Sequence, residues 1–198
     1  MPAPKASTYY AELVASRRAT LSAETTAILG NTTDIVCEIG SGHGHFLTAY
    51  AREHPKTVCV GVDIIGERVA RALRKRNRAG LTHLHFLHAD ARLFLEILPA
   101  GVWISRVFVL FPDPWPKTRH HKHRILQSEF LTQLRARVHP GAELFFRTDH
   151  EPYFLEAQAS VQDHRDWRLA DIAWPFEYET VFQQRASTYH SFGAVPQS

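Results

Sequence analysis

The sequence lacks the features that place a protein in a membrane or outside the cell. It contains no run of about 18 apolar residues, the length that a helix needs to span a bilayer. Its opening residues, MPAPKASTYY, include no apolar stretch of the kind found in a secretory signal. We therefore expect a cytoplasmic protein with no membrane partner.

Cysteine is also scarce, which limits disulfide and metal chemistry. The only two cysteines, Cys37 and Cys59, lie in separate apolar runs and form no Cys-x-x-Cys spacing. The 13 histidines include no His-Glu-x-x-His motif and no Cys/His pairing of the zinc type. We expect two buried, reduced thiols and no metal site.

The pattern that is present predicts one α/β domain. A chain of 198 residues with 44% hydrophobic residues can bury one sizeable core. Short apolar runs alternate with helical patterns from residue 34 onward, which is typical of βαβ units. We predict strands at 34–40, 57–63, 83–90, 104–113 and 142–149, and two closing strands within 166–174 and 179–187. The expected fold is a doubly wound, Rossmann-like sheet, mostly parallel with an antiparallel closing strand, and with helices on both faces.

Helical patterns fill the intervals between these strands. They predict helices over 45–53, 67–78, 126–138 and 151–161. In the third of these, Leu126, Phe130, Leu134 and Val138 recur every four residues. Residues 9–29 predict one or two amphipathic helices, broken near Leu21-Ser22. We therefore divide the chain into a helical extension (1–33) and a main domain (34–198).

The first predicted strand ends in a glycine-rich turn, in which Glu38 precedes Gly40, Gly42 and Gly44. Glycines permit a tight turn and the close approach of a ligand to the start of a helix. A dinucleotide-binding motif would need glycine at position 45, which is His45. The acidic residue and the Gly-x-Gly-x-Gly spacing resemble motif I of class I S-adenosylmethionine-dependent methyltransferases, which implies that cofactor.

Two aspartates end the next two predicted strands. Asp63 could accept hydrogen bonds from ribose hydroxyls, and Asp90 from an adenine amino group. Either side chain could instead cap the helix that follows it.

The fourth predicted strand leads into FPDPWPK (111–117) and then TRHHKHR. Its prolines make the loop rigid, so that Trp115 could stack on a base and Asp113 could accept from the N–H edge of a base. Cations that could neutralise phosphates follow at Lys117, Arg119, Lys122 and Arg124. A solvated basic loop is the alternative interpretation.

These motifs together resemble the tRNA (guanine-N7-)-methyltransferase family. The similarity covers roughly residues 34 to 185 and includes a Thr-Asp-His-Glu-Pro-Tyr segment at 148–153. It implies that 34–198 is a methyltransferase domain that methylates N7 of a guanine in the variable loop of tRNA. The implied cofactor contacts are Glu38, Asp63, Asp90 and Asp113; the implied substrate contacts are Lys117, Arg119, Asp149, Thr180 and Gln183. Gln183 stands where the family usually has glutamate, and His123 where it usually has a cation.

The catalytic role that we assign to Asp113 is orientation. Guanine N7 has a lone pair and no proton, so its methylation does not demand a general base. Two alternatives remain open at this point: a class I methyltransferase for a small molecule or protein, and a non-catalytic RNA-binding protein. The sequence also leaves open a monomer or a homodimer.

Charge is unevenly distributed although the net charge is only +3. Residues 66–80 contain six Lys or Arg and one Glu. Four of them, Arg68, Arg71, Lys75 and Arg78, fall on one helical stripe, which we interpret as a solvated face. We favour the 117–124 loop for direct contact with RNA.

Overall fold

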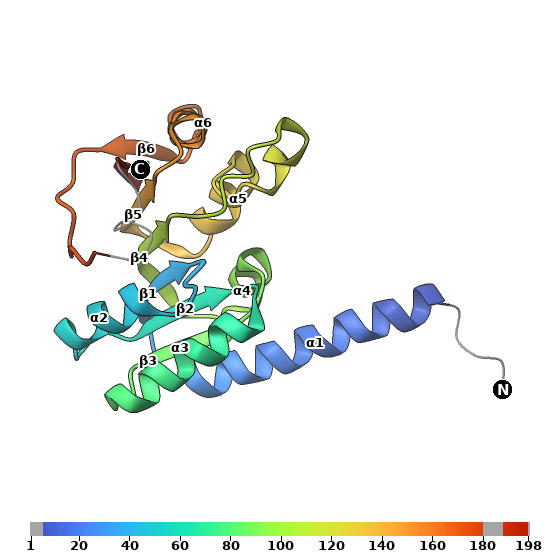
Figure 1. Cartoon of the computed structure of the whole chain (residues 1–198). Helices are drawn as coiled ribbons and strands as arrows, with labels where there is room; N and C mark the ends of the chain where they lie inside the picture. The colour runs from blue at the N-terminus through green and yellow to red at the C-terminus, as the bar shows by residue number, and fades with distance from the viewer. Residues whose placement is uncertain (1–5, 180–187, 198) are drawn as a thin grey trace.

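A seven-stranded sheet crosses the molecule in the order β3-β2-β1-β4-β5-β7-β6 (Figure 1). The computed structural model describes residues 6–179 and 188–197. The strands are β1 (Asp34–Ile39), β2 (Cys59–Asp63), β3 (Leu84–His88), β4 (Trp103–Leu110), β5 (Val138–Thr148), β6 (Trp167–Ala170) and β7 (His190–Pro196). The first five pair in parallel, and β7 is antiparallel to β5 and β6. The predicted doubly wound, mostly parallel sheet is confirmed.

Helices cover both faces of this sheet. They are α1 (Ala6–Leu29), α2 (His45–Glu53), α3 (Gly66–Ala79), α4 (Ala91–Ile97), α5 (Ser128–Arg135) and α6 (Glu151–Gln162), with the 3-10 helix η1 (Thr118–His123) after β4. One hydrophobic cluster joins α2 and α3 to the sheet, and a larger one joins the end of α1 with α4, α5 and α6 to the other face. In β1, Ile35 and Cys37 face the larger cluster while Val36 faces the smaller one, as the two-residue period of a strand requires.

Helix α1 is one continuous helix, so the predicted break near Leu21-Ser22 is wrong. The chain has neither proline nor glycine between Ala6 and Leu29, and alanine favours helix throughout. The prediction of an amphipathic helix holds only at its end, where Leu21 and Leu29 are buried, whereas residues 12–20 are exposed. Figure 1 shows the first half of α1 extending away from the sheet.

The four-residue repeat from Leu126 to Val138 is not one helix. Only Phe130 and Leu134 lie in α5, which ends at Arg135. Val138 begins β5 and pairs with Ile104 of β4. All four apolar residues are buried, which shows that burial alone can imitate a helical period.

The closing strands differ in part from the prediction. The first lies within 166–174, as β6. The second is β7, further along the chain than predicted; the predicted segment 179–187 lies outside the described residues except for Glu179.

The two cysteines are buried and unpaired with each other. Burial, with a smaller contribution from the Glu38 charge, raises the pKa of Cys59 to about 12. Burial raises the pKa of Cys37 as well, so both side chains are protonated thiols near neutral pH, in agreement with the prediction of buried, reduced thiols.

Candidate active site

The carboxyl ends of β1 to β5 meet at one edge of the sheet because these strands are parallel. The predicted site residues follow at this edge: the glycine turn after β1, Asp63 at the end of β2, Asp90 after β3, Asp113 after β4 and Asp149 after β5. The strand order reverses between β1 and β4. Open α/β sheets bind their ligands at such a reversal.

The turn after β1 requires glycine for two different reasons. Gly40 and Gly42 have φ angles of 75° and 52°, and a Cβ added at either would meet no atom within 4 Å. These two positions leave space for a ligand. Gly44 has a φ angle of 66°, and a Cβ there would lie 2.5 Å from the ring of Phe86. Gly44 therefore allows the start of α2 to pack closely.

Asp63 holds the glycine turn in place. Its Oδ2 accepts a hydrogen bond from the Gly42 N–H at 2.8 Å, and its Oδ1 accepts one from the Ile65 N–H at 2.8 Å. Each carboxylate oxygen can accept a second hydrogen bond. A contact with ribose is compatible with this role and stays a prediction.

The Glu38 carboxylate is buried near the end of β1 with an unsatisfied oxygen. The residue is 4% exposed, and its Oε2 has no hydrogen-bond partner. Burial raises the pKa of Glu38, and the Asp63 charge raises it further. A hydrogen bond from the Leu47 N–H lowers the pKa and so partly offsets the effect of burial. The buried Ser41 hydroxyl also has no partner. Buried polar groups are normally paired, so these two fit a ligand that brings donors, such as the ammonium group of S-adenosylmethionine.

Asp90 adopts the capping role that the sequence left open. Its Oδ1 accepts from the backbone N–H groups of Arg92 at 2.9 Å and Leu93 at 3.3 Å, at the start of α4. The Asp90 side chain is otherwise exposed. A contact with adenine stays a prediction.

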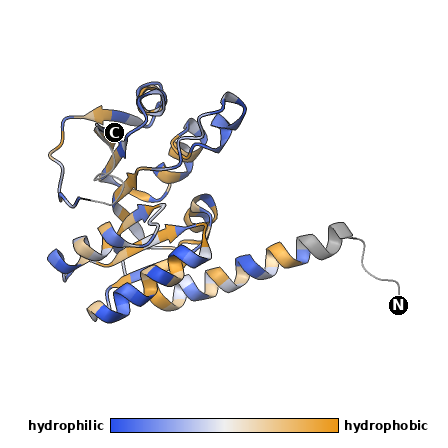
Figure 2. Ribbon diagram, in the orientation of Figure 1, coloured by the Kyte–Doolittle hydropathy of each residue, from blue (hydrophilic) through white to orange (hydrophobic). Residues whose placement is uncertain are grey.

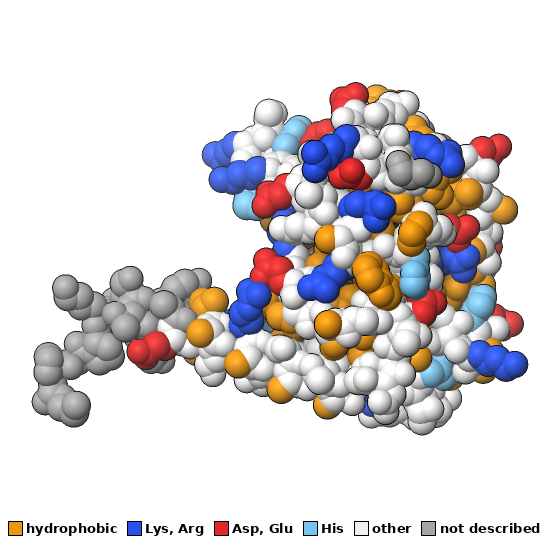
Figure 3. Space-filling view, turned by 180° about the vertical axis from the view of Figure 1, so that it is seen from behind, with side chains coloured by type: hydrophobic (Ala, Val, Ile, Leu, Met, Phe, Trp, Pro, Cys, Tyr) orange, Lys and Arg blue, Asp and Glu red, His pale blue; other side chains and the backbone are white. Residues whose placement is uncertain are grey.

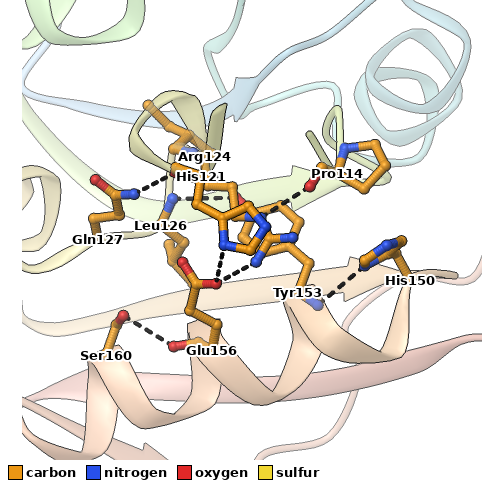
Figure 4. A network of polar contacts seen from close by, with 10 residues as sticks. Pro114, His121, Arg124, Leu126, Gln127, His150, Tyr153, Glu156 and Ser160 are labelled. Atoms are coloured by element: carbon orange, nitrogen blue, oxygen red, sulfur yellow. Dashed lines mark hydrogen bonds and ion pairs between the residues drawn. The ribbon is translucent and has the colours of Figure 1, made fainter. Parts of the chain in front are cut away.

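Arg124 is a buried residue that holds the basic loop after β4 against α6. It is 1% exposed, donates to the Pro114 carbonyl oxygen at 2.8 Å and pairs with the Glu156 carboxylate of α6 (Figure 4). Its guanidinium carbon lies 4.9 Å from the centroid of the Tyr153 ring. The assignment of Arg124 to phosphate binding is therefore wrong, because the guanidinium is enclosed by protein groups.

The remaining cations of this loop point outward. Lys117, Arg119 and Lys122 are exposed. Figure 3 shows blue and pale blue side chains gathered on the projecting tip at the upper left, where the loop lies. These three side chains are available to a polyanion.

Two residues with positive φ enclose the Pro112-Asp113-Pro114 segment. Phe111 has a φ angle of 47° and Trp115 one of 46°, a region that bulky residues rarely occupy and that often marks functional sites. The Asp113 side chain is exposed. Trp115 is 36% exposed, and its ring centroid lies 5.0 Å from that of His123.

The Thr-Asp-His-Glu-Pro-Tyr segment supports the same loop. The Tyr153 hydroxyl accepts from the backbone N–H groups of Ile125 at 3.1 Å and Leu126 at 3.3 Å. His150 caps α6, since its Nδ1 accepts from the Tyr153 N–H at 3.1 Å. Asp149, which directly precedes His150, has an exposed side chain.

Sequence reasoning missed Glu156 and Arg147, which anchor the surroundings of the site. Arg147 is 5% exposed near the end of β5, donates to both Glu177 oxygens at 3.0 and 2.9 Å, and lies 3.9 Å from the Trp174 ring centroid. A charged residue within the apolar run LFFRTD was the available signal. Arg147 ties residues 171–179 to the sheet; Thr180 and Gln183, which come next, lie outside the described residues.

Most of the chain matches one protein family. Residues 32–189 match the family model described as "Putative methyltransferase". The tRNA (guanine-N(7)-)-methyltransferase of Jannaschia sp. (strain CCS1) is 32% identical over 171 residues, which cover 80% of this chain and 72% of that protein. The chain belongs to the tRNA (guanine-N(7)-)-methyltransferase family.

Other members of this family are longer. The relative from Nitrosomonas eutropha is 36% identical over 131 residues, 66% of this chain and 58% of that protein. The chain spans about half the length of several curated relatives that it matches. Among solved structures, the aminoglycoside resistance methyltransferase NpmB1 has a TM-score of 0.60 and 19% identity, over 89% of this chain and 93% of that chain. The latter likeness shows the methyltransferase fold alone.

Two further observations concern residues 6–179 and 188–197 only. No helix in these ranges has the length and apolar character to cross a membrane. No group of three or more His, Cys, Asp or Glu residues in them is placed to hold a metal ion.

Proposed function

We propose that this chain transfers a methyl group from S-adenosylmethionine to N7 of a guanine in the variable loop of tRNA. The observation that carries the proposal is the pair of loops at the β1 and β4 strand ends. The loop after β1 is a glycine turn beside the Glu38 carboxylate, one oxygen of which has no hydrogen-bond partner. The loop after β4 carries Asp113 and is held by the hydrogen bond from Arg124 to the Pro114 carbonyl oxygen. Family membership supports the choice of tRNA as substrate and of guanine N7 as acceptor.

The glycine turn and its neighbours would hold the cofactor. The residues are Glu38, Gly40, Gly42, Gly44, Asp63, Asp90 and Asp113. When bound, S-adenosylmethionine supplies an electrophilic methyl group. Glu38 would satisfy its free oxygen by accepting from a cofactor donor, and Gly40 and Gly42 would allow close approach of the backbone.

Positioning is the main task that remains for the protein. Guanine N7 attacks through its lone pair and loses no proton, and correct orientation can supply about 7–11 kcal/mol of barrier reduction. Asp113 would accept hydrogen bonds from the N–H edge of guanine, with Trp115 offering a stacking face. Arg124 fixes the carbonyl of the neighbouring Pro114 and thereby the direction of Asp113.

Cations and polar groups around Asp113 would bind the rest of the RNA. Lys117 and Arg119 would pair with phosphates, and Asp149, Thr180 and Gln183 would contact the substrate near the guanine. We also propose residues 1–33 as a helical extension to a methyltransferase domain at 34–198, and a cytoplasmic location, where tRNA would be available.

The test is transfer of a labelled methyl group to unmodified tRNA, followed by mapping of 7-methylguanine. We expect Asp113→Ala to lower kcat by at least about 100-fold, because misplacement of the reacting base alone can cost that much. Cofactor affinity, measured by calorimetry, should fall by much less. Asp163→Ala, which removes an exposed carboxylate after α6, is the matched control. Label at a position other than guanine N7, or full activity of Asp113→Ala, would contradict the proposal.

A further inference from the structure

A basic hollow of about 270 Å³ lies beside the glycine turn, between the start of α2 and the outward side of α3. Figure 2 shows α3 mostly in the hydrophilic colour. The residues that line the hollow are His43, His45, Arg71, Arg74, Lys75 and Arg78. The four from α3 fall at i, i+3, i+4 and i+7, so they share one face of the helix. The hollow thus differs from the predicted stripe by including Arg74 and omitting Arg68.

The cations of this hollow are poorly neutralised. Arg71 forms an exposed ion pair with Glu67 at 2.9 Å. In the part of the chain that the structure describes, no carboxylate lies within ion-pair distance of Arg74, Lys75 or Arg78. Like charges this close repel one another, and an anion in the hollow would relieve that repulsion.

Lys75 is the least exposed of the four α3 cations that line the hollow. Its ammonium donates to the His43 carbonyl oxygen at 2.8 Å, which directs it to the glycine turn. Burial and, to a smaller extent, the Arg78 charge lower the pKa of Lys75 to about 8, while the Glu38 charge opposes this change. Burial and the Lys75 charge also lower the pKa of His45. The hollow is therefore a region of positive potential that is partly shielded from water.

We infer that this hollow binds a phosphate group of the RNA backbone. The inference rests on the proposed function, since it assigns a second contact region for the same substrate. The hollow lies on the α2–α3 face, whereas the 117–124 loop is fastened to α6, which packs in the cluster of the opposite face. A bound RNA would thus be held on both sides of the sheet edge at which the glycine turn lies. Guanidinium groups are suited to this task because they bind phosphate through two parallel hydrogen bonds.

The test compares the double variant Arg74→Ala/Arg78→Ala with Arg165→Ala/Arg168→Ala. Both pairs are exposed, and the second lies at β6, away from the hollow. Affinity for unmodified tRNA is measured over a salt series. The hollow variant should bind tRNA roughly 10-fold more weakly, and its slope of log affinity against log salt should be smaller by about 1.4 to 1.8, since each of two lost phosphate contacts contributes roughly 0.7–0.9. Its KM for tRNA should rise with kcat nearly unchanged.

Cofactor calorimetry and thermal melting complete the test. Both should match the wild type, and the milder Arg78→Gln variant should show about half of the change in slope. Unchanged tRNA affinity and slope would overturn the inference, and so would an equal loss of cofactor affinity. Binding of inorganic phosphate that is lost in the variant, with tRNA affinity unchanged, would assign the hollow to a free anion instead.

The inference and the proposed function can fail separately. Wild-type protein that binds tRNA through these arginines but transfers no methyl group would contradict the proposed function alone. Normal methylation with an unchanged KM in the hollow variant would contradict the inference alone.

Discussion

At the residue scale, the buried Glu38 carboxylate opposes folding at neutral pH. Burial and the Asp63 charge raise the pKa of Glu38 in the folded protein above the value of 4.5 that is usual for an exposed glutamate. The folded state therefore holds this proton more tightly than the unfolded chain. The resulting stability is present in acid and is lost as the pH rises from the unfolded pKa through the folded one.

We predict that Glu38→Gln stabilises the fold while weakening cofactor binding. The variant should exceed the wild type in free energy of unfolding at pH 7.5, and the difference should close as the pH falls below about 4.5. Cofactor affinity should fall by roughly 10-fold or more, the effect of about 1.4 kcal/mol for a lost charged hydrogen bond. Urea titrations at several pH values and calorimetry measure the two effects. Glu129→Gln, which changes an exposed glutamate, is the control. A difference in stability between Glu38→Gln and the wild type that does not vary with pH would refute the role of Glu38.

At the scale of elements, Arg124 links the loop after β4 to α6, a helix about 30 residues later in the sequence. It joins the Pro114 carbonyl and the Glu156 carboxylate of α6, and it lies over the Tyr153 ring. Tyr153 in turn binds the backbone just after Arg124. The loop after β4 thus depends on α6 for its conformation.

We predict that Arg124→Ala lowers the free energy of unfolding by about 2–3 kcal/mol. Removal of one partner from a buried ion pair costs about 3–5 kcal/mol, and the value here should be smaller because Glu156 is partly exposed. tRNA binding should weaken while cofactor affinity changes by less than about threefold. Chemical denaturation and calorimetry measure both effects. The control is Lys122→Ala, a change at an exposed residue of the same loop, which should leave the free energy of unfolding unchanged. Equal losses of stability in the two variants would show that Arg124 does not hold the loop in place.

Helix α1 offers a second prediction at this scale. Residues 12–20 are exposed, whereas Leu29 is fully buried in the core. Deletion of residues 1–15 should shift the melting temperature by no more than about 2 °C, and Leu29→Ala should cost about 2–5 kcal/mol. Thermal and chemical denaturation test both. A deletion as damaging as Leu29→Ala would mean that the first half of α1 contributes to the fold.

The elements also show how far sequence patterns determine the fold. The alternation of β-branched runs and helices predicted the five parallel strands, because hydrophobic period and strand length are local properties. The end of α5 and the start of β5 were not predictable in this way, because Val138 joins the sheet by pairing with Ile104 of β4, which is distant in sequence. The same holds for β7, whose place depends on its pairing with β5 and β6.

At the scale of the whole molecule, we assign contact with RNA phosphates to two basic regions, the 117–124 loop and the α3 hollow. Five cations of these regions are exposed and, among the described residues, form no ion pair with a carboxylate: Lys117, Arg119, Lys122, Arg74 and Arg78. If each neutralises one phosphate, log affinity for tRNA should fall against log salt with a slope of about −3.5 to −4.5. This corresponds to a loss of roughly 100- to 500-fold between 50 and 200 mM salt. Filter binding measures the slope, and a slope weaker than about −1 would contradict the assignment.

The site was predictable from the sequence where a residue follows a strand end. Asp63 and Glu38 lie at the predicted edge for this reason. Sequence alone could not separate cations that face solvent from those that face protein. Arg124 and Lys122 belong to the same basic run, yet Arg124 is buried against Glu156 while Lys122 is exposed, and Glu156 comes from a helix about 30 residues later.

The two loops of the site are fastened to different hydrophobic clusters. The glycine turn packs through Gly44 on Phe86, which belongs to the α2–α3 cluster. The loop after β4 is held by Tyr153 of α6, which belongs to the larger cluster on the other face. Local opening of α6 would therefore loosen the loop after β4 while the glycine turn stays formed. If the chain acts as proposed, the release of a methylated RNA would depend on the motion of a single helix and would be independent of the exchange of spent cofactor.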